Sequence, residues 1–169
     1  MPVTHRSAQP SLPAARPAHS PASLSELARR VAARTGLWKP LVRFTEPERF
    51  YVRLEQSRDH EVWLLTWLPG QGTDIHNHGG SSGAFTVVDG ALDETTFRPG
   101  AAPARPRPRL LGAGALRSFG PRYVHEVVNR GTAPAVSVHA YSPALTTMSY
   151  YRHLDDGTLV LDRTEGVDR

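Results

Sequence analysis

Three histidines in two separate segments are the residues of this 169-residue chain whose types and spacing could do chemistry. His76 and His78 flank one asparagine in DIHNH, and His125 begins the later segment HEVVN. Residues two apart in a strand point to the same face, so the first pair can present two imidazoles to one ion. Neutral imidazole binds zinc, copper, iron and nickel, and catalytic metals commonly keep positions open for substrate. The spacing therefore predicts a metal site on strands, completed by His125.

A second polar group alternates with small apolar residues in the segment AVSVHAYSP. Ser137, His139 and Tyr141 would share one face of a strand, and the opposite face would carry Val136, Val138 and Ala140. On pattern alone, such a polar face more often meets solvent. It would lie inside a barrel only if the hydroxyl, the imidazole and the phenol satisfied one another by hydrogen bonding.

Arg53 raises the same question in the segment RFYVRLE. Phe50, Val52 and Leu54 make the opposite strand face apolar, so the default expectation is a solvated arginine on a half-buried strand. Burying a guanidinium without an anion costs several kcal/mol, and an inward Arg53 would therefore imply an anionic ligand. A planar carboxylate matches the guanidinium fork in bidentate fashion.

Composition bounds the class of protein. An apolar content of 39% in 169 residues predicts one domain with one core. The sequence has no apolar run near the roughly 18 residues that span a bilayer. Without cysteine or a recognisable signal peptide, the expected location is the cytoplasm. The formal charge is +4, but the arginines are dispersed without an aromatic platform, so we expect no nucleic-acid partner. We also expect a monomer.

The chain divides into a tail and a domain. Residues 1–22 are rich in Pro, Ala and Ser without an acidic residue, which predicts disorder. Residues 23–169 form the predicted single domain. Ser23 and Glu26 have the spacing of a capping box, and Gly36 would end the helix. The apolar face of this helix would comprise Leu24, Leu27, Ala28 and Val31.

Strand patterns follow the helix, among them FYVRLE, EVWLLTWLP, GAFTVVDGALDETTF and SVHAYS. Asp89-Gly90 lies between two apolar runs and predicts a two-residue hairpin. The Pro-rich basic stretch 98–109 predicts an exposed loop between strands. Many short strands after one helix imply an all-β fold, a small antiparallel barrel with one or more short N-terminal helices.

The spacing around the paired histidines resembles the cupin motif, whose fold is a jelly-roll barrel. Gly70, His76, His78 and Gly90 match its first half, while Gly83 stands at the position of the usual acidic metal ligand. The second half is matched in part: His125 and Asn129 fit, whereas Gly120 and Arg122 replace its Pro-x-Gly.

Three-histidine cupins with these segments resemble the type I cysteine dioxygenase family, over roughly residues 49–143. The resemblance implies that His76, His78 and His125 hold Fe(II). It also implies that Arg53 grips the substrate carboxylate, with Tyr51 two residues before it. Ser137, His139 and Tyr141 match the hydrogen-bonded relay of the family, and Ser142-Pro143 matches a step that is often cis. Gly83 replaces the cysteine that animal members crosslink to the tyrosine, which is typical of a bacterial form.

The implied function is a non-haem iron thiol dioxygenase that oxidises L-cysteine with O2 to cysteine sulfinic acid. Tyr141 would remain a phenol and donate a hydrogen bond toward oxygen or substrate, oriented by His139, which Ser137 holds. Three alternatives stay open. The substrate could be another thiol acid such as 3-mercaptopropionate, although such members usually carry glutamine in place of Arg53. The chain could also be a different metallocupin, or a ligand sensor without catalysis.

Overall fold

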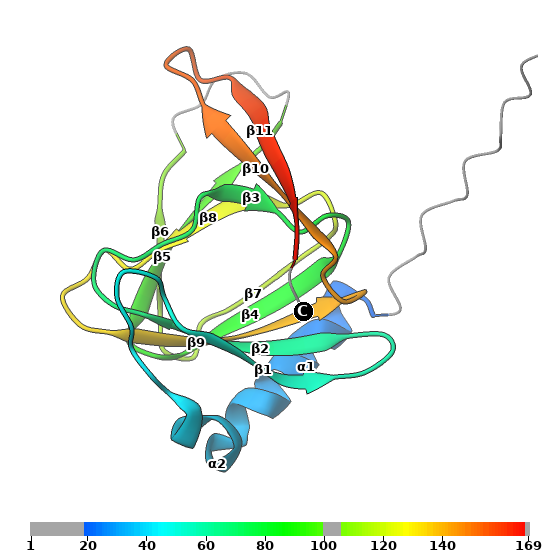
Figure 1. Ribbon diagram of the computed structural model, residues 1–169, viewed down its shortest axis with the longest axis vertical. Helices are drawn as coiled ribbons and strands as arrows, with labels where there is room; N and C mark the ends of the chain where they lie inside the picture. Colours follow the sequence, from blue (N-terminus) through cyan, green and yellow to red (C-terminus); the bar gives the residue numbers. More distant parts are fainter. Residues whose placement is uncertain (1–18, 100–105, 168–169) are drawn as a thin grey trace, which may run out of the picture.

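The computed structural model describes residues 19–99 and 106–167. They form two antiparallel sheets that face each other, with short helices on one outer face (Figure 1). The strand order is β1-β2-β9-β4-β7 in the five-stranded sheet and β11-β10-β3-β8-β5-β6 in the six-stranded sheet. This arrangement confirms the predicted small antiparallel barrel with N-terminal helices.

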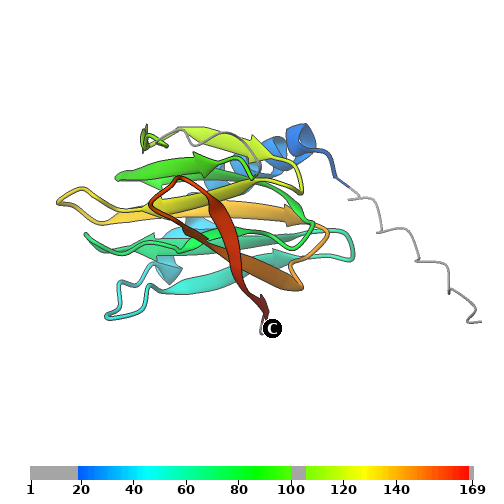
Figure 2. The same ribbon diagram turned by 90° about the horizontal axis from the view of Figure 1, so that it is seen from above.

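Eleven strands are assigned within the described residues. Their bounds are β1 (Tyr51–Gln56), β2 (Glu61–Trp67), β3 (Ile75–Asn77), β4 (Ser82–Asp89), β5 (Ala91–Phe97), β6 (Arg109–Gly112), β7 (Leu116–Phe119), β8 (Val124–Val128), β9 (Ala135–Ser142), β10 (Thr147–His153) and β11 (Leu159–Gly166). Figure 2 shows β10 and β11 running obliquely across the other strands.

The first helix differs from the prediction at both ends. α1 (Pro21–Ala33) begins before Ser23, because Ser20 is the N-cap and its hydroxyl accepts a hydrogen bond from the Ser23 amide at 3.2 Å. The capping box of Ser23 and Glu26 was therefore wrong, and proline in the first turn suits a helix that begins at residue 21. α1 also ends before Gly36, and α2 (Thr35–Trp38) and the 3-10 helix η1 (Lys39–Leu41) follow it.

Residues 1–18, which make up most of the predicted tail, lie outside the described residues. Among the helices that are described, none is long and apolar enough to cross a membrane.

The apolar face of α1 covers the outer face of the five-stranded sheet. Its buried residues Leu24, Leu27, Ala28 and Val31 pack in one cluster with outward-facing residues of β2, β4 and β9. β9 is the central strand and every one of its residues is buried. The helix thus covers the apolar side of β9, which leaves its polar side for the interior of the barrel.

The bend at Asp89-Gly90 corrects a prediction. β4 and β5 flank Gly90 but do not pair with each other; β4 pairs with β7 and β9, and β5 pairs with β6 and β8. Gly90 has φ of 71°, a conformation that glycine adopts without strain. The dipeptide therefore passes the chain from one sheet to the other instead of closing a hairpin.

The Pro-rich stretch connects two paired strands. β5 ends at Phe97 and β6 begins at Arg109, and the two strands are antiparallel neighbours. A connection between strands was predicted here, and its residues 100–105 lie outside the described residues.

Candidate metal centre

Two neighbouring strands of the six-stranded sheet bring the three histidines together. His76 lies on β3 directly opposite His125 on β8, and His78 follows β3 on the same face as His76. The ring centroid of His76 lies 4.8 Å from those of both other histidines, and the ring centroid of His78 lies 5.2 Å from that of His125. All three are buried, and one nitrogen from each lies within 4.8 Å of the others. This is the geometry of a group that could hold one metal ion.

Hydrogen bonds at Nδ1 orient two of the three rings. His76 Nδ1 lies 2.8 Å from the carbonyl oxygen of Asp74, and His125 Nδ1 lies 2.9 Å from Oε1 of Glu94. A carbonyl and a carboxylate only accept hydrogen bonds, so each Nδ1 carries the proton and each Nε2 keeps its lone pair. Nδ1 of His78 is buried and has no partner among the described residues.

His76 and His78 are neutral, which is the form that binds metals. Burial is the main cause that lowers the pKa of His76 to about 3, and the nearby His125 lowers it further. Burial likewise holds the pKa of His78 well below its ordinary value. The site offers the Nε2 lone pairs of His76 and His125, a third buried imidazole with an unpartnered nitrogen, and an open cavity beside them. These donors fit a borderline metal such as ferrous iron.

Glu94 on β5 is a buried carboxylate behind His125. Besides the imidazole, its Oε1 accepts a hydrogen bond from the Tyr123 hydroxyl at 2.9 Å, and its Oε2 accepts one from Nε of Arg117 at 2.7 Å. Burial alone would raise the pKa of Glu94, but these hydrogen bonds outweigh it and hold the pKa below its ordinary value. A carboxylate thus reaches the metal centre indirectly, through His125, while Gly83 provides none directly.

Replacing Glu94 by leucine is expected to weaken metal binding by about 10- to 100-fold, the usual cost of losing an outer partner of a metal-binding histidine. Glu94→Gln keeps an acceptor for His125 without the charge and should fall between wild type and Glu94→Leu. Chelator competition measures both, with Asp93→Asn on the other face of β5 as the control. Wild-type affinity in Glu94→Leu would show that His125 needs no such partner.

Ser137, His139 and Tyr141 form a chain of hydrogen bonds inside the barrel. Ser137 Oγ lies 2.7 Å from Nε2 of His139, whose Nδ1 lies 3.2 Å from the Tyr141 hydroxyl. Trp67 Nε1 donates to Ser137 Oγ at 2.9 Å, and sequence reasoning had not included this indole. The mutual satisfaction that an inward polar face requires is therefore met.

The chain of hydrogen bonds has a direction. Burial holds the pKa of His139 well below its ordinary value, so the ring is neutral and carries one proton. Because Ser137 accepts from the Trp67 indole, we assign its own proton to Nε2 of His139, which leaves the His139 proton on Nδ1, donated to Tyr141. The Tyr141 proton is then free, and burial raises the pKa of Tyr141, so the phenol stays protonated.

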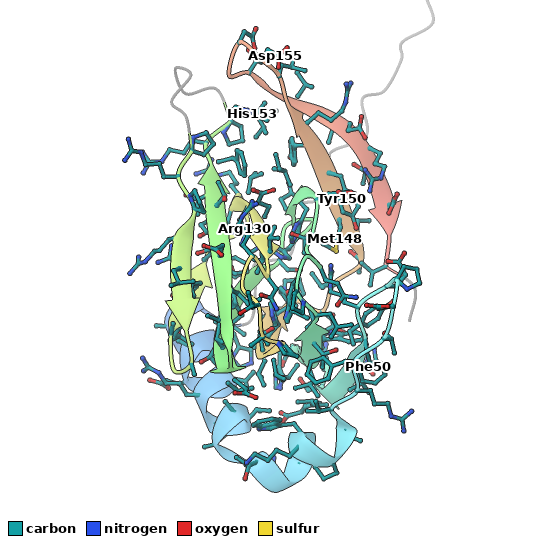
Figure 3. The ribbon with its side chains drawn as sticks, turned by 90° about the vertical axis from the view of Figure 1, so that its left-hand side faces the viewer. Phe50, Arg130, Met148, Tyr150, His153 and Asp155 are labelled. Atoms are coloured by element: carbon teal, nitrogen blue, oxygen red, sulfur yellow. The ribbon has the colours of Figure 1, made fainter. Side chains whose placement is uncertain are left out.

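A cavity of about 310 Å³ lies beside these groups. His76, His125, His139 and Tyr141 contribute to its wall, as does Tyr51. Met148 and Tyr150 reach it from β10 (Figure 3). Most of the remaining wall is apolar: Trp63, Leu65, Trp67, Val127, Leu145 and Val167.

Arg53 has an inward position on β1 but is not among the residues that line the cavity in the described part of the chain. Its Nη1 lies 3.7 Å from Oε2 of the buried Glu61, and its guanidinium lies over the ring of Trp63 at 5.3 Å. An inward Arg53 was expected to imply an anionic ligand, but the chain's own Glu61 provides an anion beside it. The pair is too long for a hydrogen bond, and Nη1 of Arg53 is buried without one among the described residues.

Arg49 lines the cavity instead. Its guanidinium lies over the ring of Trp67 at 4.8 Å, and its Nη1 donates to the carbonyl of Gly72 at 2.6 Å. Nε is buried without a partner, and no carboxylate pairs with this arginine within the described ranges. Burial lowers the pKa of Arg49, but a guanidinium remains charged at neutral pH. The positive charge of Arg49 therefore lies at the cavity wall without a carboxylate partner among the described residues.

The sequence contains patterns that could have identified Arg49 and Glu94, two residues of the site that it did not predict. Arg49 is two residues before Tyr51 and four before Arg53, so strand alternation places all three on one face. Glu94 shares the strand phase of Leu92, a core residue, which is unusual for a solvated carboxylate. The Ser142–Pro143 peptide is cis, as the resemblance implied.

Several solved structures resemble this one at low sequence identity. The protein TT1209 from Thermus thermophilus is 23% identical, with a TM-score of 0.54 over 63% of this chain and 93% of its own. A Klebsiella pneumoniae protein with a double-stranded beta-helix domain is 20% identical, with a TM-score of 0.53 over 74% and 93%. A cupin superfamily protein from Desulfitobacterium hafniense is 12% identical, with a TM-score of 0.51 over 63% and 87%. These likenesses show the fold alone.

No curated protein is a significant match to the chain. The profile described as cysteine dioxygenase type I, however, matches residues 22–153, a range that includes the three histidines, the relay and Arg49. A match over most of the chain, together with the cupin fold and the buried histidine group, leads to one conclusion: this chain belongs to the cysteine dioxygenase type I family.

Proposed function

We propose that this protein is an iron-dependent dioxygenase that adds both atoms of O2 to the sulfur of a small thiol carboxylic acid, with L-cysteine as the first candidate substrate. The observation that carries the proposal is the buried three-histidine group at a cavity whose arginine, Arg49, has no carboxylate partner among the described residues. Thiol and O2 balance to the sulfinic acid, so the reaction consumes no other reductant.

The proposed roles divide between holding the metal and holding the substrate. Held by His76, His78 and His125, ferrous iron would supply open coordination positions and the one-electron chemistry that O2 requires. Arg49 binds the substrate carboxylate through a charge-assisted pair in this largely apolar cavity, with Tyr51 at the same wall. Arg53, predicted from the sequence for this role, is the competing assignment.

Tyr141 is the proposed donor toward the reacting oxygen or the substrate, because its proton is not used within the chain of hydrogen bonds. His139 holds the phenol oxygen and Ser137 fixes the tautomer of His139. The relay therefore holds the Tyr141 hydroxyl in one orientation. Tyr141 stays protonated and able to donate, because burial raises its pKa.

Tyr141→Phe is expected to lower kcat/KM by about 10- to 100-fold, because a hydrogen bond to a charged group is worth about 1.5–3 kcal/mol. Iron content should not change, since Tyr141 is not a ligand. Tyr150→Phe, which removes a hydroxyl from the same cavity wall, is the matched control. Equal losses in both variants would contradict a specific role for Tyr141.

A second candidate substrate is 3-mercaptopropionate. The cavity wall contains Arg49 but no aspartate or glutamate among the described residues, so an α-ammonium group meets no side-chain counter-charge. This observation favours a thiol acid without an amine, whereas the presence of Arg53 in the sequence favoured cysteine.

The proposal is tested by loading the protein with iron under anaerobic conditions and measuring O2 uptake with cysteine, 3-mercaptopropionate and cysteamine. We expect uptake with one or both carboxylates and little with cysteamine. A different metallocupin or a ligand sensor would bind metal or ligand but consume no O2 with any of the three thiols.

A further inference from the structure

His78 is oriented in a different way from the other two histidines of the metal centre. His76 and His125 each direct Nδ1 to an oxygen acceptor, whereas Nδ1 of His78 has no partner among the described residues and is buried. A ligand ring without a hydrogen bond at its second nitrogen must be held by packing if it is to stay aimed at an ion.

Two aromatic rings supply that packing. The ring of Phe119, from β7, stacks on His78 at a centroid distance of 4.8 Å and an interplanar angle of 24°. The ring of Tyr141 packs at 5.0 Å and 33°. These distances lie within the range of attractive aromatic contacts. Both rings are almost fully buried, so neither exchanges this contact for solvent.

Gly83 makes room for the ring of Phe119. In the five-stranded sheet Gly83 on β4 lies opposite Phe119 on one side and opposite Tyr141 on the other. A Cβ atom built on Gly83 would lie 2.5 Å from Cε2 of Phe119 and 3.0 Å from Cδ1 of Tyr141. Its φ is not positive, so the backbone does not require glycine here. Space for the neighbouring rings is what excludes a side chain.

The same ring connects His78 to the partners of His125. Phe119 also stacks on Tyr123 at 4.8 Å and 9°, and the Tyr123 hydroxyl donates to Glu94. Phe119 therefore also packs against a residue that is itself hydrogen-bonded to the carboxylate behind His125.

We propose that Phe119 is a positioning residue of the metal centre, which aims His78 and supports Tyr141, and that Gly83 admits its ring. The proposal rests on the metal centre of the proposed function and adds to it a residue that contacts neither metal nor substrate. It predicts that ring loss at residue 119 acts on metal binding as well as on turnover.

The test compares Phe119→Leu with Phe85→Leu. Phe85 is a matched control because it is buried in the same core cluster and stacks on His139 at 4.9 Å and 9°, not on His78. Its ring centroid lies 6.1 Å from that of His125, at 52°, so it does not stack on that ligand. We expect Phe119→Leu to weaken Co(II) and Fe(II) binding by about 10- to 100-fold in chelator competition and to alter the visible absorption of bound Co(II). Phe85→Leu should leave both metal readouts as in wild type.

Gly83→Ala provides an independent variant that keeps the ring but displaces it. It should reproduce the loss of metal affinity, and the double variant Gly83→Ala/Phe119→Leu should lose less than the sum of the two, because the smaller side chain relieves the collision. Thermal unfolding identifies any variant that fails to fold.

The outcomes separate the two proposals. A wild type that binds no metal contradicts the proposed function. A wild type that binds metal, with Phe119→Leu and Gly83→Ala binding it equally well, overturns the role of Phe119. So does an equal loss of affinity in Phe119→Leu and Phe85→Leu, which would indicate a general effect of core packing.

Discussion

Replacement of His125 by alanine is expected to yield a protein that neither retains iron nor oxidises thiols. His125 lies opposite His76 and is the only one of the three histidines whose ring is tied to a buried carboxylate in the described structure. Its loss leaves two ligands and removes one of the three hydrogen-bond donors of the buried Glu94, which keeps those from Tyr123 and Arg117. His76→Ala and His78→Ala should give the same result.

Elemental analysis after anaerobic loading measures the iron, and O2 consumption measures turnover. His153→Ala is the control, because that histidine is exposed at the end of β10. Full iron and full turnover in His125→Ala would show that the metal centre lies elsewhere.

The second large effect is expected at Arg49. Losing a charge-assisted pair inside a site typically costs about 2–5 kcal/mol, a factor of roughly 30 to several thousand. Arg49→Gln should therefore lower kcat/KM for cysteine and 3-mercaptopropionate by such a factor. Activity with cysteamine, which has no carboxylate, should change little, so the ratio of carboxylate to cysteamine activity collapses.

Arg53→Gln distinguishes the two arginines. This variant breaks the pair with Glu61 and should lower stability, but the ratio of carboxylate to cysteamine activity should stay at the wild-type value. The reverse pattern, with the ratio lost in Arg53→Gln and kept in Arg49→Gln, would return the carboxylate to Arg53.

The histidine group could be predicted because it depends on local rules. Strand alternation alone places His76 and His78 on one face, and motif spacing identifies His125 as the third member. The sequence also contains the reason why the polar face of β9 can point inward. Ser137, His139 and Tyr141 can hydrogen-bond to one another.

Other features depend on the third dimension. Turn chemistry at Asp89-Gly90 predicts a reversal of the chain, but it does not say which sheet receives the next strand. Alternation predicts that Arg49 and Arg53 share a face, but it does not predict how far along the barrel each side chain lies. That position decides that Arg53 pairs with Glu61 and that Arg49 lines the cavity. The partners of Glu94 lie far from it in the sequence, so no local pattern predicts them.

The most direct test of the central claim is the fate of the oxygen atoms. Iron-loaded protein is supplied with 18O2 and the thiol carboxylate that it oxidises fastest, and the product is examined by mass spectrometry. A dioxygenase yields a sulfinic acid with both oxygen atoms labelled. A product with one labelled oxygen, or a disulfide with no added oxygen, would contradict a thiol dioxygenase.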